Sequence, residues 1–513
     1  MSDKVGKVYL LGGGPGDPEL LTLRARRRLG EADLVLYDAL IHPDLVALAR
    51  EDAERVFVGK RAGKPSERQE RINERMIAAA RQGKTVARLK GGDPYLFGRG
   101  SEEAEALEAA DIPFEVVPGV PSPLAATAYA GISLSHRNLA SSIAYVTATE
   151  SPEKDASAHD WSKLATATQT LVIFMGVRKL ESLMQRLVDH GRDPDCPAAV
   201  IQAASLPTQR TITGTVGTIA GLAREAGIGM PALTVVGEVV RLREHLRWYD
   251  LQPLFGKRVL LTRPAAQAAP MARALRDAGA QPLIIPAIRI APPDDPAALT
   301  HSVVAAGDYD WVVFTSANGV DAFFAELAAE RADARRLGGV RVAAIGPATA
   351  ERLREHGVRA DEVPAEYRGE AVAEAILAHH DGHMHGLSVL LPRAAVARDA
   401  LPDALRRAGA RVDVVPAYRT LPLEAADAAR LRTAIEVGEA DVITFTSSST
   451  VEHTVGALGS EAAALLSRLT VASIGPITSE TAGRHGLQVA VTARDYTAGG
   501  LVAALAQHFD PEH

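Results

Sequence analysis

Short apolar runs alternate with amphipathic stretches through the first half of the chain. The first run, from Val8 to Leu11, is followed by apolar residues at helical spacing and then by a second run from Leu34 to Tyr37. Runs of this length predict buried strands, and a spacing of three and four residues predicts the helix that covers them. Further strands are expected near residues 55–58 and 85–89, with a helix over 69–81 between them. The pattern predicts an α/β fold.

The loop after the first strand is rich in glycine and consists of Gly12, Gly13, Gly14, Pro15, Gly16, Asp17 and Pro18. It lacks the last glycine of G-x-G-x-x-G, and no Gly-Lys-Ser/Thr follows it. Pro15 also lacks the amide donor that a phosphate-binding loop uses. We therefore expect a ligand with little or no phosphate, held by backbone and shape. For the loop taken alone, a tight turn without a ligand is the simpler interpretation.

A second glycine-rich loop, GGDPYLFGRGSEE, follows the strand at 85–89. The segment FEVVPGVPS then provides a rigid break suited to a lobe boundary, and the strands beyond residue 143 are longer and more hairpin-like. We predict two lobes, about 1–118 and 119–250, with a cleft between them, and a linker at 251–256. The acidic run EEAEALEAA near Glu102 is interpreted as an exposed helix face.

The second half, 257–513, contains an internal repeat. KRVLLTRPAAQAAP from Lys257 matches LSVLLPRAAVARDA from Leu387, and WVVFTSANGV from Trp311 matches VITFTSSSTV from Val442. A third pair is VAAIGPAT from Val342 and VASIGPIT from Val471. Two copies of one strand and helix set predict two similar parallel-sheet lobes, which bind ligands at the carboxyl ends of their strands. From the repeat alone, this half is a two-lobed ligand-binding module.

Composition and charge narrow the class of protein. Hydrophobic residues make up 47% and charged residues 23% of the 513, which is typical of a soluble globular protein, and no apolar run approaches the length of a membrane helix. The N-terminal residues show no signal-peptide pattern, and the single cysteine, Cys196, favours the cytoplasm. The net charge of −7 argues against nucleic acid as a partner. No metal is expected, because a Cys-based cage is excluded and the histidines near His380 are interpreted as part of a surface loop.

Motifs along the first half together carry a family resemblance. GGGPGDPELLTLRA, LVLYDALI, VFVGKRAG, RLKGGDPYLFGRG, VVPGVPS, AYAGISLSHR and TLVIFMGV occur in the order and spacing of the tetrapyrrole methylases, and most closely resemble uroporphyrinogen-III C-methyltransferase. The repeated half resembles uroporphyrinogen-III synthase, through FTSANGV, AIGPAT, LLPRA, PAYRT, FTSSS, SIGPIT and YTAGGL. The second family makes the substrate of the first, so the pairing supports both assignments.

The methylase resemblance implies S-adenosylmethionine in the cleft of the first half. The positions that match the cofactor contacts of the family are Gly14, Pro15, Gly16, Gly91, Gly92, Asp93, Leu96, Pro121, Ser122, Met175 and Ala204. Core packing is the alternative interpretation of Leu96 and Met175. The chain departs from the family at Pro121, where a Thr is usual, and at Gln202 to Ser205, where Glu-Asn-Gly-Thr is usual.

The same resemblance implies roles in proton transfer and substrate binding. Asp38 matches the proposed base of the family and Lys60 its proposed acid. The alternatives are a capping carboxylate for Asp38 and a surface ammonium for Lys60. Uroporphyrinogen carries eight carboxylates, so a local basic funnel is expected from Lys60 together with Arg61, Arg88, Lys90 and Arg137.

The synthase resemblance implies discontinuous lobes. One is expected over about 257–286 plus 421–509, and the other over about 290–416. The reaction closes linear hydroxymethylbilane with inversion of its last ring, so restraint by amides and hydroxyls should suffice. The loops that supply such groups contain Thr315, Ser316, Thr446, Ser447, Ser448, Gly475 and Thr478. Tyr418 is the candidate for assisting departure of the substrate hydroxyl. The alternative is that Tyr418 braces the link between the lobes.

These inferences combine into a bifunctional cytoplasmic enzyme. It is expected to make uroporphyrinogen III and to methylate it twice, giving precorrin-2 for sirohaem or cobalamin, as a homodimer through the methyltransferase half. The alternative is an active methyltransferase with a non-catalytic, tetrapyrrole-binding regulatory module at its C-terminus.

Overall fold

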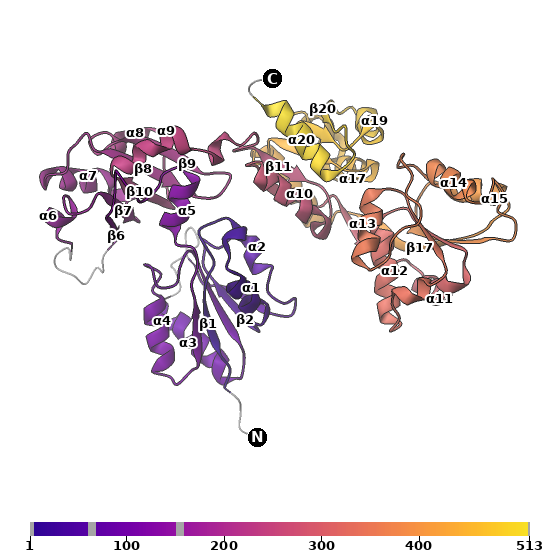
Figure 1. The fold of residues 1–513 in the computed structure, drawn as a ribbon, viewed down its shortest axis with the longest axis horizontal. Coiled ribbons are helices and arrows are strands. Elements are labelled where there is room, and N and C mark those ends of the chain that lie inside the picture. The colour runs from indigo at the N-terminus through magenta and orange to yellow at the C-terminus, as the bar shows by residue number, and fades with distance from the viewer. Residues whose placement is uncertain (1–4, 60–67, 150–158, 511–513) are drawn as a thin grey trace. The chain divides into compact units, whose positions relative to one another are not determined.

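The computed structural model describes residues 5–59, 68–149 and 159–510. The chain forms two compact units (Figure 1). The first contains residues 1–256 together with 278–281, and the second contains the remainder. Residues 251–256, expected as a linker, are packed: Leu254 is fully buried and its amide donates to the Ala278 carbonyl at 2.9 Å. Within the described ranges, no helix combines the length and the apolar character needed to cross a membrane.

The first unit begins with a parallel five-stranded sheet in the order β3-β2-β4-β1-β5. Its strands are β1 (Val8–Gly12), β2 (Leu34–Tyr37), β3 (Glu54–Phe57), β4 (Val86–Lys90) and β5 (Phe114–Val117). Its helices are α1 (Leu23–Gly30), α2 (Pro43–Val46), α3 (Gln69–Arg81) and α4 (Gly100–Glu108). Figure 1 shows α3 and α4 on one side of this sheet and α1 and α2 on the other.

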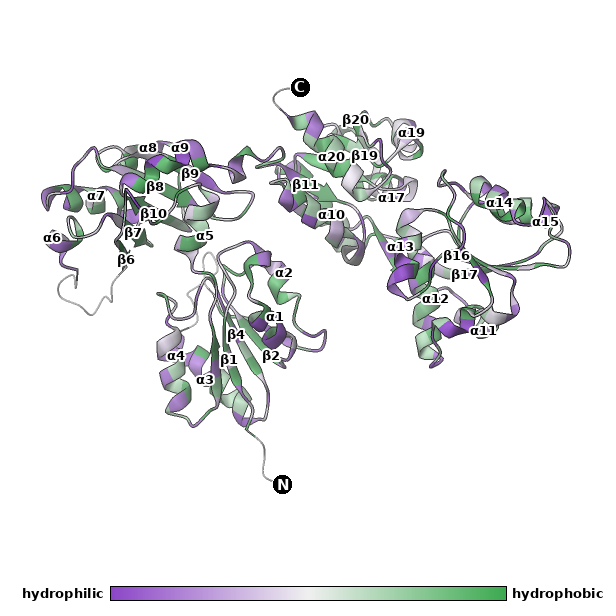
Figure 2. Cartoon of the chain, viewed as in Figure 1, coloured by the Kyte–Doolittle hydropathy of each residue, from purple (hydrophilic) through white to green (hydrophobic). Residues whose placement is uncertain are grey.

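Strand β1 is apolar throughout because both of its faces are covered. Leu11 packs in the cluster on the α1 side, whereas Leu10 packs in the cluster on the α3 side. A parallel sheet sandwiched between helices requires this continuous apolar run. Figure 2 shows the hydrophobic residues concentrated on β1 and β4.

The second sheet of this unit has the order β6-β7-β10-β8-β9, and only β6 and β7 are parallel. Its strands are β6 (Ile143–Thr147), β7 (Thr170–Phe174), β8 (Pro197–Gln202), β9 (Arg210–Thr215) and β10 (Ala232–Val236). The helices here are α5 (Ser122–Tyr129), α6 (Trp161–Leu164), α7 (Leu180–Asp189), α8 (Ile219–Glu225) and α9 (Arg243–Leu246). The antiparallel pairs agree with the hairpin-like pattern of this segment.

The second unit contains two more five-stranded sheets. The first has the order β12-β11-β18-β19-β20, with strands β11 (Arg258–Leu261), β12 (Gln281–Ile284), β18 (Val442–Phe445), β19 (Thr470–Ser473) and β20 (Val489–Thr492). The second has the order β13-β17-β16-β14-β15, with strands β13 (Ile288–Ala291), β14 (Trp311–Phe314), β15 (Arg341–Ala344), β16 (Ser388–Ala394) and β17 (Arg411–Pro422). Each sheet takes strands from segments far apart in the sequence, which confirms the predicted fold class.

Helices flank both of these sheets. Those associated with the first sheet are α10 (Ala265–Asp277), α16 (Ala425–Glu436), α17 (Ser448–Leu458), α18 (Ala462–Leu466), α19 (Pro476–Arg484) and α20 (Ala498–Phe509). Those associated with the second are α11 (Pro296–Val304), α12 (Ala317–Ala329), α13 (Pro347–Glu355), α14 (Gly369–Ala378) and α15 (Ala400–Arg407). The repeat-equivalent residues Phe314 and Phe445 are both fully buried, one in the core of each lobe.

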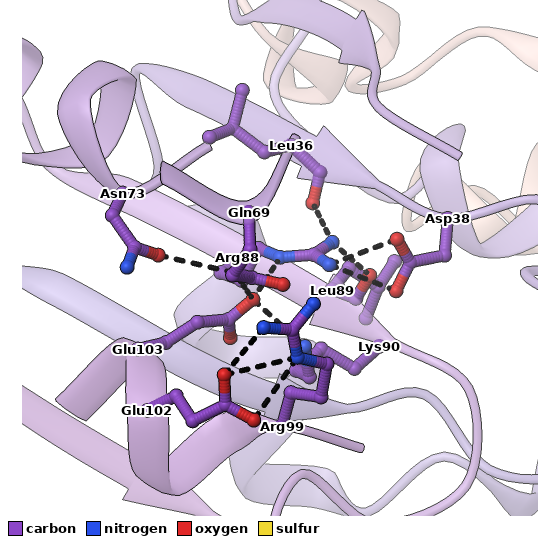
Figure 3. Close-up of polar contacts among 10 residues, drawn as sticks. All are labelled: Leu36, Asp38, Gln69, Asn73, Arg88, Leu89, Lys90, Arg99, Glu102 and Glu103. Carbon is purple, nitrogen blue, oxygen red and sulfur yellow. Dashed lines mark hydrogen bonds and ion pairs between the residues drawn. The ribbon is translucent and has the colours of Figure 1, made fainter. Parts of the chain in front are cut away.

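A network of charged residues lies between the first sheet and the helices α3 and α4. Arg88 and Lys90 alternate with Leu89 on β4 and therefore share the face that α3 and α4 cover. Glu103 of α4 is fully buried, and its Oε1 accepts from Arg88 Nε at 3.0 Å and from Lys90 Nζ at 2.8 Å. Gln69 of α3 donates to the same oxygen at 3.0 Å (Figure 3). The interpretation of the whole acidic run as an exposed face is wrong for Glu103, because its position on the helix directs it at two buried cations.

Charges in this network set the protonation of its members. Burial alone would lower the pKa of Arg88, but the carboxylates of Glu103 and Asp38 raise it above its ordinary value. Burial and the neighbouring Arg88 lower the pKa of Lys90. A buried pair of cations is tolerated only when carboxylates with good geometry face it, so Glu103 is required for the fold.

Replacing Glu103 by Gln should therefore destabilise the first unit by about 3–5 kcal/mol, because the shape is kept while one of the two negative charges facing Arg88 and Lys90 is lost. The control is Glu102→Gln. Glu102 pairs with Arg99 on the surface, with both side chains about half exposed, and the cost there should be below about 1 kcal/mol. Hydrogen exchange of peptides from α3, β4 and α4 measures both. Equal protection in the two variants would contradict the assigned role of Glu103.

Candidate functional site

The candidate site is formed by three loops at the carboxyl edge of the first sheet. They follow β4, β1 and β5, which are neighbours in that order. Gly92 N donates to Gly14 O at 2.7 Å and Gly14 N donates to Gly92 O at 3.2 Å, so the two glycine-rich loops are joined directly. Gly13 N donates to Lys90 O at 2.7 Å. Because these three amides are used internally, they are not free to donate to a phosphate.

Glycine is required where the third loop meets the other two. A Cβ on Gly119 would lie 2.2 Å from Gly92 O, and one on Gly12 would lie 2.4 Å from Gly119 N. The carboxylate of Asp93 fixes this approach, since it accepts from Gly119 N at 3.1 Å and from Tyr95 N at 2.8 Å. Asp93 therefore has a structural task in addition to the ligand contact expected of it.

The first loop also reaches the second sheet of this unit. Asp17 N donates to Ser205 Oγ at 3.1 Å, and the Tyr129 hydroxyl donates to Asp17 Oδ2 at 2.8 Å. Burial, together with this bond to the carboxylate, raises the pKa of Tyr129. A Cβ on Gly16 would lie 2.8 Å from Ala204 O, so Gly16 and Ala204 lie close together.

Strained backbone accompanies the second-sheet side of the site. Met175, directly after β7, has φ of 54°, and Ala203 and Ser205, after β8, have φ of 49° and 61°. Non-glycine residues adopt this left-handed region at a cost, and such strain is concentrated at functional sites. Met175 is 48% exposed, which disfavours the interpretation that it is a core residue.

The residues present suit a compact ligand of the predicted kind. Among the described residues other than its chain neighbours, the nearest atom to a Cβ placed on Gly92 would be Ser122 N, at 3.7 Å, so there is open space beside Asp93. Pro121 caps α5 and Ser122 begins it, which leaves both next to this space. Pro15, Gly91 and Leu96 are partly exposed in the joined loops. These residues are compatible with S-adenosylmethionine, which the resemblance implies and which needs no phosphate cradle.

Asp38 follows β2 at the same edge of the sheet. Its two carboxylate oxygens accept from Arg88 Nη2 at 2.8 and 3.0 Å, and its side chain stays 29% exposed (Figure 3). Asp38 is thus held in one orientation by a buried cation while an edge remains open to a substrate. Lys60 and Arg61, its expected neighbours in function, lie outside the described residues.

The expected basic funnel is corrected in part. Arg88 is 2% exposed and Lys90 is 3% exposed, because both face Glu103 within the sheet unit. In this structure they cannot contact a substrate directly, and Arg88 acts on the site through Asp38. Arg137 is exposed, as a surface role requires. The sequence alone could have indicated the burial, since Arg88 and Lys90 occupy alternate positions of a strand otherwise rich in apolar residues.

In the second unit, each repeated Thr-Ser loop joins a strand to a helix. Ser316 caps α12 by accepting from Gly319 N at 3.1 Å, and Ser447 caps α17 by accepting from Thr450 N at 3.3 Å. Thr315 and Thr446 precede these caps and are partly exposed. Ser448 and Thr481 share a hydrogen bond of 2.8 Å, whereas Gly475 and Thr478 are buried at the start of α19.

Tyr418 is brought to one of these loops. It lies on β17, and its hydroxyl is 3.0 Å from Ser316 Oγ. The side chain is 7% exposed and its ring belongs to the lobe core. The hydroxyl alone is therefore directed at a loop that the sequence analysis assigned to substrate binding.

Two tyrosines that the sequence analysis missed flank the Gly-Pro loops. Tyr367 packs on Gly346 and Tyr496 packs on Gly475, where an added Cβ would lie 3.0 and 3.1 Å from the respective rings. The two rings are 6.5 Å apart and both are about half exposed. The sequence could have indicated both tyrosines, because each follows its Gly-Pro motif at the same spacing.

Two families of known proteins match different parts of this chain. Residues 7–220 match the family described as Tetrapyrrole (Corrin/Porphyrin) Methylases, and residues 269–503 match that described as Uroporphyrinogen-III synthase HemD. A uroporphyrin-III C-methyl transferase from Thermus thermophilus, solved in complex with S-adenyl homocysteine, is 41% identical. The match covers 46% of this chain and 100% of that one, with a TM-score of 0.40.

Two curated relatives show different extents of similarity. A siroheme synthase from Stutzerimonas stutzeri is 48% identical over 247 residues, which are 48% of this chain and 52% of that protein. The chain thus spans about half the length of the siroheme synthases that it matches. The porphyrin biosynthesis protein HemD of Ruminiclostridium josui is 37% identical over 491 residues, 95% of either chain. This chain therefore belongs to the family of proteins that join a tetrapyrrole methylase to a uroporphyrinogen-III synthase.

Proposed function

We propose that this chain cyclises hydroxymethylbilane to uroporphyrinogen III, with inversion of the last ring, and then methylates that product twice to give precorrin-2. The observation that carries the proposal is the presence of both family matches in one chain, in an arrangement shared with a relative along 95% of its length. Because the product of one activity is the substrate of the other, the two halves are then consecutive steps of one route.

The proposed cofactor of the first half is S-adenosylmethionine, which supplies a methyl group on a sulfonium. Gly92, Asp93 and Ser122 would contact it from the first-sheet side, and Met175 and Ala204 from the second. Methyl transfer to an electron-rich pyrrole carbon depends on alignment, so the fixed approach of the glycine loops is the expected protein contribution.

Asp38 is the proposed base that accepts the proton that the porphyrinogen loses elsewhere on its ring system when a pyrrole carbon is methylated. The two hydrogen bonds from Arg88 Nη2 keep its carboxylate oriented, and the exposed edge leaves it a path to the substrate. Lys60 is proposed as the acid, by the resemblance alone. In the second half, Tyr418 is proposed to assist hydroxyl departure, with the Thr-Ser loops restraining the linear substrate.

A single-pot assay tests the whole proposal. Freshly made hydroxymethylbilane, incubated with the purified chain alone, should give isomer III, and addition of S-adenosylmethionine should give a product carrying two more methyl groups. Isomer analysis and mass spectrometry measure the two outcomes. Isomer I alone would instead indicate a binding module in the second half, and methylation would then be tested with supplied uroporphyrinogen III.

Asp38→Asn should lower kcat of methylation by about 10²- to 10⁴-fold, because the amide cannot accept the proton. Binding of S-adenosylhomocysteine, followed by calorimetry, should change little. The control is Asp52→Asn, which removes a surface carboxylate paired with Arg50. If kcat of Asp38→Asn stayed within threefold of the wild type, Asp38 would not be the base.

Tyr418→Phe should lower kcat of isomer III formation by about 10²-fold or more if the hydroxyl assists departure. Tyr309→Phe is the matched control in the same lobe, since it removes a hydroxyl that donates to Asp413 at 2.8 Å. Steady-state kinetics and thermal unfolding of both variants separate catalysis from bracing. If both variants lost equal stability and kcat of Tyr418→Phe were unchanged, Tyr418 would be a residue that braces the link between the lobes.

A further inference from the structure

A partly buried guanidinium of the second unit, that of Arg263, has no counter-ion among the described residues. Arg263 lies between β11, which ends at Leu261, and α10, which begins at Ala265. The preceding Thr262 is fully buried and donates to Thr444 O at 2.8 Å, so the backbone here is fixed to β18. Arg263 itself is only partly exposed. Among the described residues, no side chain or carbonyl makes a hydrogen bond or ion pair with it.

Burying the Arg263 guanidinium without a counter-ion lowers the stability of the folded chain. Burial lowers the pKa of the Arg263 guanidinium, and no neighbouring carboxylate opposes the effect. A desolvated cation is normally retained only when a counter-charge compensates it. Its persistence without one therefore points to an anion that is not part of the chain.

The internal repeat supplies a built-in comparison. In the alignment from Lys257 and Leu387, Arg263 corresponds to Arg393, the last residue but one of β16 in the other lobe. Arg393 is 8% exposed, donates to Arg398 O at 2.7 Å and pairs with Asp399. The position equivalent to Asp399 is Ala269, so the first copy lacks the carboxylate that neutralises the second.

The location of Arg263 is that of a ligand contact. Strands β11 and β18 are parallel neighbours, so Arg263 lies at the same sheet edge as the loop of Thr446 and Ser447. Gln267, in the first turn of α10, donates to Asn318 of the other lobe, so this end of α10 faces the loop that begins α12. Ligands of such sheets bind at the carboxyl ends of the strands.

We propose that Arg263 binds a carboxylate of the polycarboxylated tetrapyrrole on which the second half acts, while its repeat equivalent Arg393 is purely structural. The proposal rests on the proposed function for the identity of the ligand. A guanidinium binds a carboxylate through two parallel hydrogen bonds, which fixes orientation as well as affinity. The asymmetry between the two copies then gives an otherwise two-fold repeated site one preferred direction for its substrate.

The test uses the full chain with hydroxymethylbilane in the absence of S-adenosylmethionine. Arg263→Gln should raise KM for isomer III formation by about 10- to 100-fold with kcat changed less than threefold, and Arg263→Lys should fall between. The control, Arg468→Gln, removes an exposed arginine before the amino end of β19 and should leave KM unchanged. An unchanged KM in Arg263→Gln overturns the proposal.

Two further measurements keep the test independent of turnover. In thermal unfolding, Arg263→Gln should be at least as stable as the wild type, because a desolvated charge is removed. Arg393→Gln should be less stable than the wild type. A loss of stability in Arg263→Gln would show that Arg263 is a structural residue. Titration with uroporphyrin I, a stable octacarboxylate, should show one class of site weakened about tenfold or more in Arg263→Gln. If the wild type forms only isomer I, the proposed synthase activity fails, and the titration alone then decides the role of Arg263. An isotherm unchanged by Arg263→Gln, or no binding of uroporphyrin I by the wild type, overturns the proposed role of Arg263.

Discussion

The close approach of three backbones at Gly12, Gly92 and Gly119 is the constraint on which the first half depends. A Cβ on Gly12 or Gly119 would overlap main-chain atoms of the facing loop, and Gly92 has a φ of 68°, which favours glycine. Because glycine allows the contact, the loops after β1, β4 and β5 close into one rigid edge, and Asp93 secures it through amide donors. The same closure uses the amides of Gly13, Gly14, Gly92 and Gly119 in hydrogen bonds within the chain.

Buried charged residues on one face of the first sheet orient a carboxylate at its carboxyl edge. Glu103 neutralises two cations on β4, and one of them, Arg88, extends to Asp38 on the neighbouring strand. The orientation of a partly exposed carboxylate is thereby linked to a fully buried one. This arrangement explains why basic residues in a motif that suggests substrate binding are instead inside the protein.

The two copies of the repeat in the second half are similar but not identical. Both copies have an arginine at or just beyond the end of their first strand, and both place a tyrosine against the Gly-Pro loop. In both, the serine of Thr-Ser caps a helix. The copies differ where Asp399 has no counterpart. An asymmetric substrate needs such a difference, because two identical lobes would present it with two equivalent orientations.

The sequence by itself determined the alternation of strands and helices, the span of α3, the repeat, the fold class and the family, since each depends on local periodicity or on motif order. It also brought together most of the glycine, proline and serine positions of the candidate site, because the ends of parallel strands meet at one edge. Only the tertiary structure decided that Glu103 is buried while its neighbour Glu102 is exposed, and that Arg393 is neutralised while Arg263 is not. The physical reason is that the state of a charge depends on which distant side chains packing brings within hydrogen-bond distance, and residue spacing along one segment does not contain that information.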